Sequence, residues 1–532
     1  MKKNNIGSII FVLIVIGIMI FAGYTIYDNN RKVEEAEIIK KEEENSSKNK
    51  VTDIRIGITN FDTINPYISQ NKSILDINTL VYESLFTITK DYKLENCLAT
   101  QCSYVGNNTY IIKILPNANF SNGNTITIDD IIFSINTLKN GNSVYKTYVE
   151  HIQSTEMIDA TTLRIVLDAE IPYFEYYLTF PIVYRGDYEG QDFYSSGITP
   201  VGSGRYIISD ISQNSITLSK NTGWRNIGDD NAYIETIILN LYQSKGEEFN
   251  AFKISNTDIL TTNISNYTDY TGTIGYNQLT YPGREFDFLA FNCTDEILQY
   301  KEVRQAISYA IDKENIVSSV FNNSYVKANY PLDYGNYLYT TDNNSSGFNS
   351  DQSKKILEDA GWEYASGRWS KRIDGRTVRL DLKLSVQEEV YKRASTADII
   401  KTQLENIGIH CTIEKIDTEK YYKYIEEKNY QMMITGVINS YNPELGHFFG
   451  PGNIMNYTNN DMQNLLNSAK GETNATELKN DFDKIYRIYI QDVPFVGLYR
   501  DKYVLLTSQN LMGEMYPNNY SILYNIEEWY RK

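Results

Sequence analysis

The clearest pattern of apolar and polar positions lies between residues 286 and 321. It begins with Phe286–Phe291, a short aromatic and apolar run that predicts a buried strand. The apolar positions that follow recur at helical spacing, at Val303, Ala306, Ile307, Ala310 and Ile311. That stripe predicts a helix with one buried face. Asp312 comes next and can cap a second helix, whose own apolar stripe ends at Phe321.

Short strands and amphipathic helices alternate in the same way along most of the chain. Ile54–Ile58 alternates like a strand, and the helix after it carries apolar residues up to Leu85. Later, Ser350 or Asp351 can cap a helix that ends at Gly361. Another helix stops at Gly408 and leads into an alternating strand. No repeat of fixed period appears, so the pattern predicts an α/β protein and not a solenoid.

The first residues form an unbroken apolar run from Ile6 to Tyr27, long enough for a helix to span a bilayer. A cleaved secretory signal is the alternative, but the only small pair near the end of the run is Ala22-Gly23 and its cleavage site is poor. We therefore expect an uncleaved anchor over residues 1–27. Lys2 and Lys3 place the N-terminus in the cytoplasm and the rest of the chain outside the cell. Residues 28–50 are charged and are predicted to form a solvated stalk.

Length and charge narrow the classes of function. Beyond the stalk about 480 residues remain, too many for one ordinary core and enough for two or three lobes. The chain is 42% hydrophobic and holds 45 tyrosines, as expected of a folded exterior rich in amphipathic rings. Its formal net charge of −17 repels nucleic-acid phosphates, so no nucleic-acid partner is expected.

Cysteine and histidine are scarce. Cys97 and Cys102 are near enough in sequence to close a small loop, and spacing alone leaves open whether they form a disulfide. Cys293 and Cys411 lie in strand-like surroundings and are interpreted as small core residues. The four cysteines and three histidines show no zinc spacing, so neither a structural metal nor a cofactor is predicted.

No catalytic constellation stands out in the sequence. Gly202-Ser203-Gly204 lacks the spacing of a nucleophile elbow and is predicted to form a tight turn. The adjacent Asp129 and Asp130 follow Thr127 in a predicted first helical turn, where acidic side chains cap free N–H groups. We therefore expect a binding protein and no enzyme. An exterior peptidase or glycosidase is the alternative class.

Several segments resemble, in order, the motifs of one known family. They are DTINPYISQNKSILDINTLVYESLF, CLATQCSYVGNNTYIIKILPNANFSNGNTITIDDIIFSI, FNCTDEILQYKEVRQAISYAIDKENIV and VPFVGLYRDKYVLL. The family is that of the family 5 extracellular solute-binding proteins, the peptide- and nickel-type receptors of ABC importers. The resemblance covers about residues 54–506, and that shared order is more specific than any single motif.

This resemblance implies a periplasmic-binding-protein-like fold of type II (cluster C), a two-lobed clamp with an added third lobe. The expected lobe I comprises residues 51–88, 200–283 and 502–532. Lobe II comprises residues 89–199, and lobe III comprises residues 284–501. A cleft between such lobes can enclose a ligand while the crossing strands flex as hinges.

The resemblance also suggests which residues touch the ligand. They are Tyr145, Tyr148, Tyr281, Arg284, Asn439, Ser440, Tyr441, Asn456, Tyr457 and Tyr499. In peptide receptors of the family, an aspartate in the segment that matches Gly436–Pro443 holds the free α-amine of the ligand. The matching residue here is Ser440, or Asn439 if the gap shifts, and neither is charged. This departure suits blocked or cyclic peptides, or another solute.

The function that the resemblance implies is that of a monomeric, membrane-anchored receptor. It would capture oligopeptides outside the cell and deliver them to the permease subunits of an ABC importer. Alternatives are a receptor for an oligosaccharide or for a nickel chelate held through His447, and an exterior sensor or scavenger without transport.

Overall fold

The computed structural model describes residues 53–225, 234–272, 275–332, 335–340, 347–472 and 474–531. The predicted anchor at residues 1–27 and stalk at 28–50 lie outside these ranges. Across the described ranges, no helix is both long and apolar enough to cross a bilayer.

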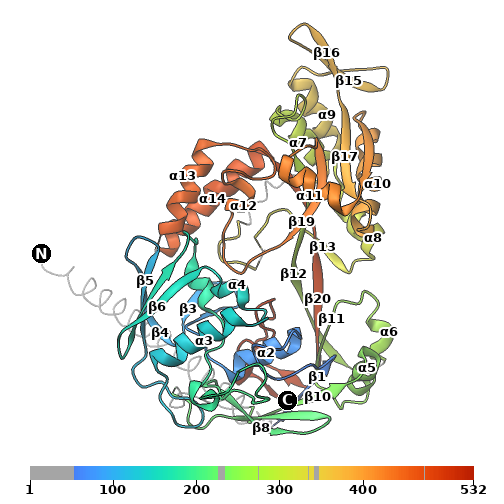
Figure 1. Ribbon diagram of the computed structural model, residues 1–532. Helices are drawn as coiled ribbons and strands as arrows, with labels where there is room; N and C mark the ends of the chain where they lie inside the picture. Colours follow the sequence, from blue (N-terminus) through green and yellow to red (C-terminus); the bar gives the residue numbers. More distant parts are fainter. Residues whose placement is uncertain are drawn as a thin grey trace, which may run out of the picture.

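One mixed sheet of 11 strands runs through the whole molecule, in the order β18-β17-β19-β12-β20-β11-β1-β10-β9-β8, with β13 paired to β20. Its central strands, β12 (Tyr276–Phe291) and β20 (Phe495–Ser508), are long and antiparallel. They run side by side from the lower half of the molecule into the upper half (Figure 1). The two halves are therefore joined by a continuous ladder of hydrogen bonds.

The lower half holds the remaining strands on one side of this pair and a second sheet. The sheet strands are β1 (Asp53–Thr59), β8 (Tyr206–Ile211), β9 (Ser215–Lys220), β10 (Thr236–Tyr242) and β11 (Ile259–Thr262). The second sheet has the order β4-β5-β7-β6, with β4 (Ala99–Tyr104), β5 (Thr109–Ile114), β6 (Ile152–Asp159) and β7 (Thr162–Leu167). Smaller strands are β2 (Phe86–Ile88), β3 (Leu94–Asn96), β21 (Leu511–Met512) and β22 (Tyr530–Arg531).

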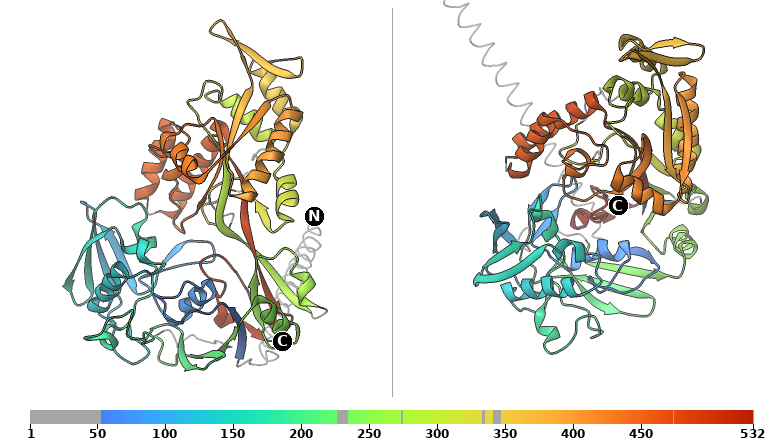
Figure 2. Two further views of the ribbon diagram at one scale, coloured as in Figure 1. Left: turned by 45° about the vertical axis from the view of Figure 1, so that its right-hand side comes forward. Right: turned by 45° about the horizontal axis from the view of Figure 1, so that its top comes forward.

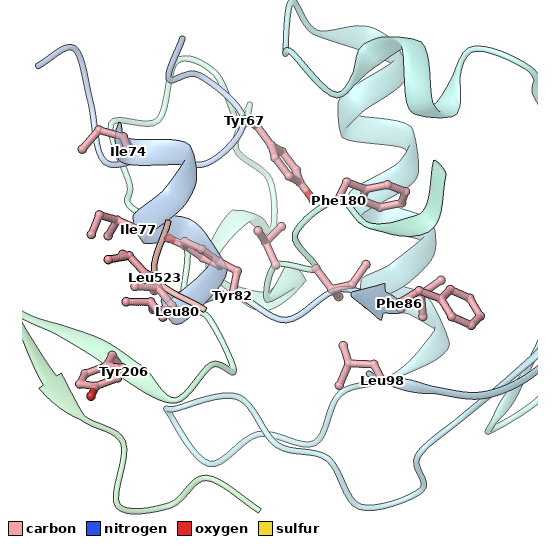
Figure 3. Close-up of a cluster of buried hydrophobic side chains, with 14 of the residues drawn as sticks. Tyr67, Ile74, Ile77, Leu80, Tyr82, Phe86, Leu98, Phe180, Tyr206 and Leu523 are labelled. Carbon is pink, nitrogen blue, oxygen red and sulfur yellow. The ribbon is translucent and has the colours of Figure 1, made fainter. Parts of the chain in front are cut away.

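Helices of the lower half flank these sheets (Figure 1). They are α2 (Lys72–Val81), α3 (Ile128–Asn140), α4 (Lys146–Val149), α5 (Lys245–Lys253), α6 (Thr268–Thr271) and the 3₁₀ turns η1 (Phe174–Leu178), η2 (Arg185–Tyr188) and η4 (Ile526–Glu528). A single buried cluster joins both sheets, and Figure 3 shows the part of it around α2, including Ile77, Leu80 and Leu523. The expected lobes I and II therefore share one hydrophobic core.

The upper half continues the large sheet with β13 (Tyr325–Lys327), β17 (Asp381–Gln387), β18 (His410–Ile416) and β19 (Met432–Ile438), and adds the hairpin strands β14 (Glu363–Ala365), β15 (Arg368–Ile373) and β16 (Arg376–Arg379). Its helices are α7 (Lys301–Ala310), α8 (Lys313–Phe321), α9 (Ser350–Asp359), α10 (Tyr391–Asn406), α11 (Thr418–Glu427), α12 (Gly446–Phe449), α13 (Asn460–Gly471) and α14 (Ala475–Asp492). These helices lie against the upper part of the sheet (Figure 2). Their apolar side chains form two buried clusters, one with α7, α8 and α10 and the other with α12, α13 and α14.

The segment around α7, which carries the strongest family resemblance, packs in the core of the upper half. The predicted stripe is confirmed, because Val303, Ala306 and Ile307 are fully buried. Arg304 is also buried, and its guanidinium donates to the carbonyls of Leu298, Gln299, Asp492 and Val493. Since the last carbonyls of a helix lack partners within it, Arg304 satisfies the end of α14.

Two of the predicted helix caps are confirmed and one is wrong. Asp312 caps α8 by accepting the N–H of Asn315, as predicted. Thr127 and Asp130 form a reciprocal capping box on α3, which confirms a structural role for Asp130. The prediction that Ser350 or Asp351 caps α9 was wrong, because Asn349 accepts the N–H of Gln352 instead. All three candidates are good capping residues, so composition could not separate them.

The prediction of a tight turn at Gly202-Ser203-Gly204 was wrong. Neither glycine has a positive φ angle, and both lie against the end of α2. A Cβ atom on Gly202 would come within 2.1 Å of the Val81 carbonyl oxygen, and one on Gly204 within 2.2 Å of the Leu80 oxygen. The glycines are needed for close backbone approach, not for a turn.

The expected lobe limits at 283/284 and 501/502 fall inside β12 and β20, where the ladder is interrupted. Pro282 pairs with Lys502 and Phe286 with Arg500, so three residues of β12 oppose Asp501 alone. The side chain of Asp501 fills this bulge and accepts the N–H of Glu285. A Cβ atom on Gly283 would lie within 2.0 Å of that carboxylate, so the bulge requires glycine. Bulges bend a strand and redirect its side chains.

A buried ionic cluster lies beside this bulge. Asp287 of β12 is fully buried and pairs with Arg393 at 2.7 Å and Lys392 at 3.2 Å, both from α10. Lys392 also pairs with Glu285, which accepts the hydroxyl of Tyr325. Removing one partner from a buried ion pair leaves the other charges uncompensated, so the cluster ties α10 to the crossing strands.

We predict that Asp287→Asn lowers the free energy of unfolding by about 3 kcal/mol or more, because two cations lose their buried carboxylate. Urea denaturation monitored by circular dichroism measures the change. The matched control is Asp381→Asn, whose partner Arg368 is exposed, and it should cost less than about 1 kcal/mol. Equal losses in the two variants would contradict the structural role given to Asp287.

Candidate ligand-binding cleft

A cavity of about 700 Å³ near the crossing strands is lined by both halves of the molecule. α2, the segment 82–88, α4 and the C-terminal segment 520–527 form most of its wall. Arg284 and Tyr441 contribute from the side of the crossing strands and the upper half. A smaller neighbouring cavity shares Arg284 and Tyr441 and is also lined by Asn439 and Ser440. Six of the ten predicted ligand-contacting residues therefore lie at these two cavities.

Tyrosines form one wall of the larger cavity. Tyr145 and Tyr148 pack edge to face with ring centroids 5.5 Å apart, and Tyr148 does the same with Tyr177 at 5.8 Å. Burial raises the pKa of Tyr145 well above its usual value, so its hydroxyl stays protonated. Such rings offer a large contact area with a polar tip, and their fixed packing limits the entropy lost on binding.

Arg284 projects from the bulge in β12, at the point where the two cavities meet. Its Nε donates to the carbonyl of Asn439 at 2.6 Å, and its own carbonyl accepts the N–H of Asn439 at 2.9 Å. The guanidinium carbon lies 4.3 Å from the centre of the Tyr441 ring. Cation–π stacking and the hydrogen bonds therefore fix the guanidinium in one place.

Hydrogen bonds hold the segment after β19 in place on both sides of Ser440. The amide of Asn439 donates to the carbonyl of Pro331, and the hydroxyl of Tyr441 donates to the carbonyl of Asn519 at 2.8 Å. Ser440 is exposed between them. No acidic side chain stands at either 439 or 440, as the sequence indicated.

The other four predicted residues lie away from both cavities. Tyr281 is buried and stacks on Tyr503, and Tyr499 is fully buried against Phe321. The remaining pair also bonds within the protein: Tyr457 donates its hydroxyl to Asp492 at 2.7 Å, and Asn456 donates to Asn292 at 3.1 Å. In this conformation these residues contribute to packing.

Sequence reasoning missed a polar cluster in the larger cavity. Glu83, nearly buried, pairs with Arg225 at 2.5 Å and accepts the indole N–H of Trp224 at 3.2 Å. Arg225 lies over Trp224, and Arg205 lies over the same ring and pairs with Glu527. Glu83 and Arg225 are 142 residues apart, so no local pattern could have joined them.

Asn78 of α2 was missed for the same reason. It lines the larger cavity, is 1% exposed, and its amide nitrogen and oxygen have no partner among the described residues. Buried amides are normally hydrogen-bonded. The side chain is therefore available to a polar group that enters the cavity.

Cys97 and Cys102 are separate free thiols, so the structure does not contain the disulfide that the spacing left open. Cys97 lines the larger cavity and donates to the carboxylate of Glu83 at 3.8 Å. Burial raises the pKa of the Cys97 thiol to about 12, and the charge of Glu83 adds to the rise. Cys293 and Cys411 are free as well, and Cys411 is buried, as predicted.

His447 is the residue that would hold the metal if the ligand were a nickel chelate. It is exposed and packs edge to face on Phe448 at 5.3 Å. No group of three or more His, Cys, Asp and Glu side chains in the described residues could hold a metal ion. The nickel interpretation therefore has no ready-made donor set in this part of the chain.

Comparison with known proteins places this chain in a family. The model of bacterial extracellular solute-binding proteins, family 5 (middle), matches residues 93–451. The chain belongs to this family. Among characterised relatives, the oligopeptide-binding protein AppA of Bacillus subtilis is 23% identical over 517 residues, covering 90% of this chain and 91% of AppA. The glutathione-binding protein GsiB of Pectobacterium atrosepticum is 22% identical over 86% of this chain and 90% of GsiB.

Solved structures of this family have the same fold. The unliganded open form of MppA, a periplasmic murein tripeptide-binding protein, matches with a TM-score of 0.76 at 17% identity, over 90% of this chain and 97% of MppA. NikZ of Campylobacter jejuni, in complex with Ni(L-His), matches with a TM-score of 0.55 at 20% identity, over 90% of this chain and 99% of NikZ. The fold prediction is thus confirmed at the level of a mixed α/β solute-binding protein.

We predict that Cys97 of the native protein reacts slowly with iodoacetamide, because only the thiolate is nucleophilic. The alkylation rate, followed by peptide mass spectrometry, should rise about tenfold per pH unit from pH 7 to pH 10 without a plateau, given a pKa of about 12. In denaturant the alkylation rate of Cys97 should level off above the ordinary thiol pKa of about 8.5. A plateau near pH 8.5 in the native protein would contradict the raised pKa of the Cys97 thiol.

Proposed function

We propose that this protein is an extracellular receptor that captures oligopeptides in the cleft at the crossing strands and delivers them to an ABC permease. The observation that carries the proposal is the cavity of about 700 Å³ lined by both halves of a molecule whose halves are joined through β12 and β20. Its tyrosine wall and fixed polar groups suit binding without covalent chemistry, so no catalytic role is proposed. Membership of the solute-binding family and the match to oligopeptide-binding AppA support the ligand class.

The proposed architecture is a type II (cluster C) clamp with a third lobe, acting as a monomer. The upper half would swing about the bulge at Gly283–Glu285 and cover the cavity. The proposed anchor is the apolar segment within residues 1–27, which would hold the receptor near its permease at the outer face of the cell membrane.

Ligand affinity in this proposal has two sources. An extended peptide can pair its backbone with exposed protein backbone, and its side chains can pack on tyrosines. Closure of the upper half then adds contacts that only the closed state offers, which shifts the population toward that state. Asn78 and the Glu83–Arg225 pair supply polar groups at the floor of the cavity.

Native mass spectrometry of the protein purified from its source under mild conditions tests the ligand class directly. We expect bound peptides, released on acidification and sequenced by tandem mass spectrometry. A co-purified nickel chelate or oligosaccharide, with no peptide and no thermal stabilisation by a peptide library, would overturn the proposed ligand class.

We predict that Tyr145→Ala and Tyr148→Ala each weaken binding of a recovered peptide about tenfold, because each removes a packed aromatic contact. Isothermal titration calorimetry gives the dissociation constants. Tyr391→Ala is the matched control, since this side chain is 80% exposed on α10, and it should bind as the unmodified protein does. Unchanged affinity in both cavity variants would remove the tyrosine wall from the proposal.

A further inference from the structure

Three of the four cations that line the larger cavity are paired with carboxylates, and Glu95 lines the cavity without an ion pair among the described residues. Lys72 pairs with Asp76, Arg205 with Glu527, and Arg225 with Glu83. Arg284 also lines the cavity, yet it forms no ion pair with any carboxylate in the described ranges of the chain. A guanidinium remains charged at all physiological pH values, so this positive charge faces the cavity uncompensated.

The guanidinium of Arg284 is held ready for a partner. Only Nε, of its five N–H donors, has an acceptor in the described part of the protein, namely the Asn439 carbonyl. The bulge at Gly283–Glu285 fixes the backbone from which the side chain departs. The remaining donors form a planar fork that matches both oxygens of a carboxylate.

The Tyr441 platform beneath the guanidinium is itself anchored to the lower half. The hydroxyl of Tyr441 donates to the carbonyl of Asn519, and the amide of Asn519 donates to the carbonyl of Pro282, next to the bulge. Tyr520 packs edge to face on Tyr441 at 5.5 Å. Because both ends of this chain of contacts return to β12, the position of Arg284 does not depend on a ligand.

The charge of Arg284 affects Tyr148, a residue of α4 that lines the larger cavity. Burial raises the pKa of Tyr148, and the positive charge of Arg284 opposes that rise. Arg284 and the tyrosine wall line the same cavity, so one ligand can contact both. Glu444, the acidic side chain that lines the smaller cavity, accepts the N–H of Gly446 and forms no ion pair with Arg284.

We propose that Arg284 binds a carboxylate of the ligand through its free N–H fork, so that this receptor selects acidic over amine-bearing groups at the junction of its cavities. The inference rests on the proposed function for its peptide ligands. Positions 439 and 440 carry no charge that could hold an ammonium group, and an ammonium placed here would be repelled by Arg284. The carboxylate comes either from the C-terminus of a peptide or from an acidic side chain.

Three pentapeptides separate these two sources in calorimetric titrations of the full-length protein. They are Ala-Ala-Ala-Ala-Ala as the free acid, the same peptide as the C-terminal amide, and Ala-Ala-Glu-Ala-Ala as the amide. Tighter binding of the free acid than of the plain amide assigns the C-terminus. Tighter binding of the glutamate-containing amide than of the plain amide assigns the side chain. We expect at least one of these preferences, roughly 10- to 100-fold, as for charged hydrogen bonds.

Variants show whether Arg284 is the source of the preference. Arg284→Gln should abolish the preference for a carboxylate, and Arg284→Lys should retain only part of it because the fork is lost. Arg368→Gln removes the same charge from an exposed site that pairs with Asp381, and should keep the full preference. Melting temperatures without ligand check that each variant is folded.

The outcomes separate this inference from the proposed function. Peptide binding with no preference for a carboxylate, or with a preference unchanged in Arg284→Gln, overturns the inference and leaves the function standing. If no peptide binds, the proposed function fails, and thermal shift with citrate and with an oligogalacturonate then decides the inference. Stabilisation that is lost in Arg284→Gln and kept in Arg368→Gln supports a carboxylate site for a non-peptide solute. No stabilisation overturns both.

Discussion

The pairing of β12 with β20 is the constraint on which the rest of this structure depends. These two strands contribute to the large sheet in both halves, and the chain passes between the halves along them. Neither half can therefore move without bending this ladder, and the cavity that both halves line is set by its shape. A two-strand connection resists sliding but allows bending, which is the property a clamp requires.

The interruption of that ladder serves more than one purpose. Asp501 occupies the bulge and replaces a lost ladder partner for Glu285, and glycine at 283 leaves room for its carboxylate. Arg284 leaves the strand at the same place and enters the cleft. Asp287, three residues after Arg284, anchors α10 through Arg393. Bending, support of the upper half and a charged cavity group thus come from one short stretch of sequence.

Local elements could be predicted because their causes are local. The buried run Phe286–Phe291, the stripe on α7 and the Asp312 cap depend on neighbours a few residues away, and all were confirmed. The family resemblance led to Tyr145, Tyr148 and the segment 439–441, which line the cavities. It could not show which face of a strand or loop a tyrosine occupies, so Tyr457 and Tyr499 lie in the core instead.

What the sequence could not reveal is the set of contacts between distant segments. Glu83 and Arg225 meet only because the chain returns to the first sheet after residue 200. Gly202 and Gly204 are required by the backbone of α2, more than 100 residues earlier, and not by their own turn. The unmatched charge of Arg284 became visible only in the structure, where Lys72, Arg205 and Arg225 of the larger cavity each meet a carboxylate.

The central claim, that the two halves close on a ligand about β12 and β20, is tested most directly by pulsed electron paramagnetic resonance. Spin labels go on Met157→Cys in β6 and Tyr422→Cys in α11, both exposed positions on opposite halves, with the native cysteines replaced by serine. The account predicts that a bound ligand moves the distance distribution to shorter values and narrows it. A ligand that binds at micromolar concentration and leaves the distribution unchanged would contradict the clamp.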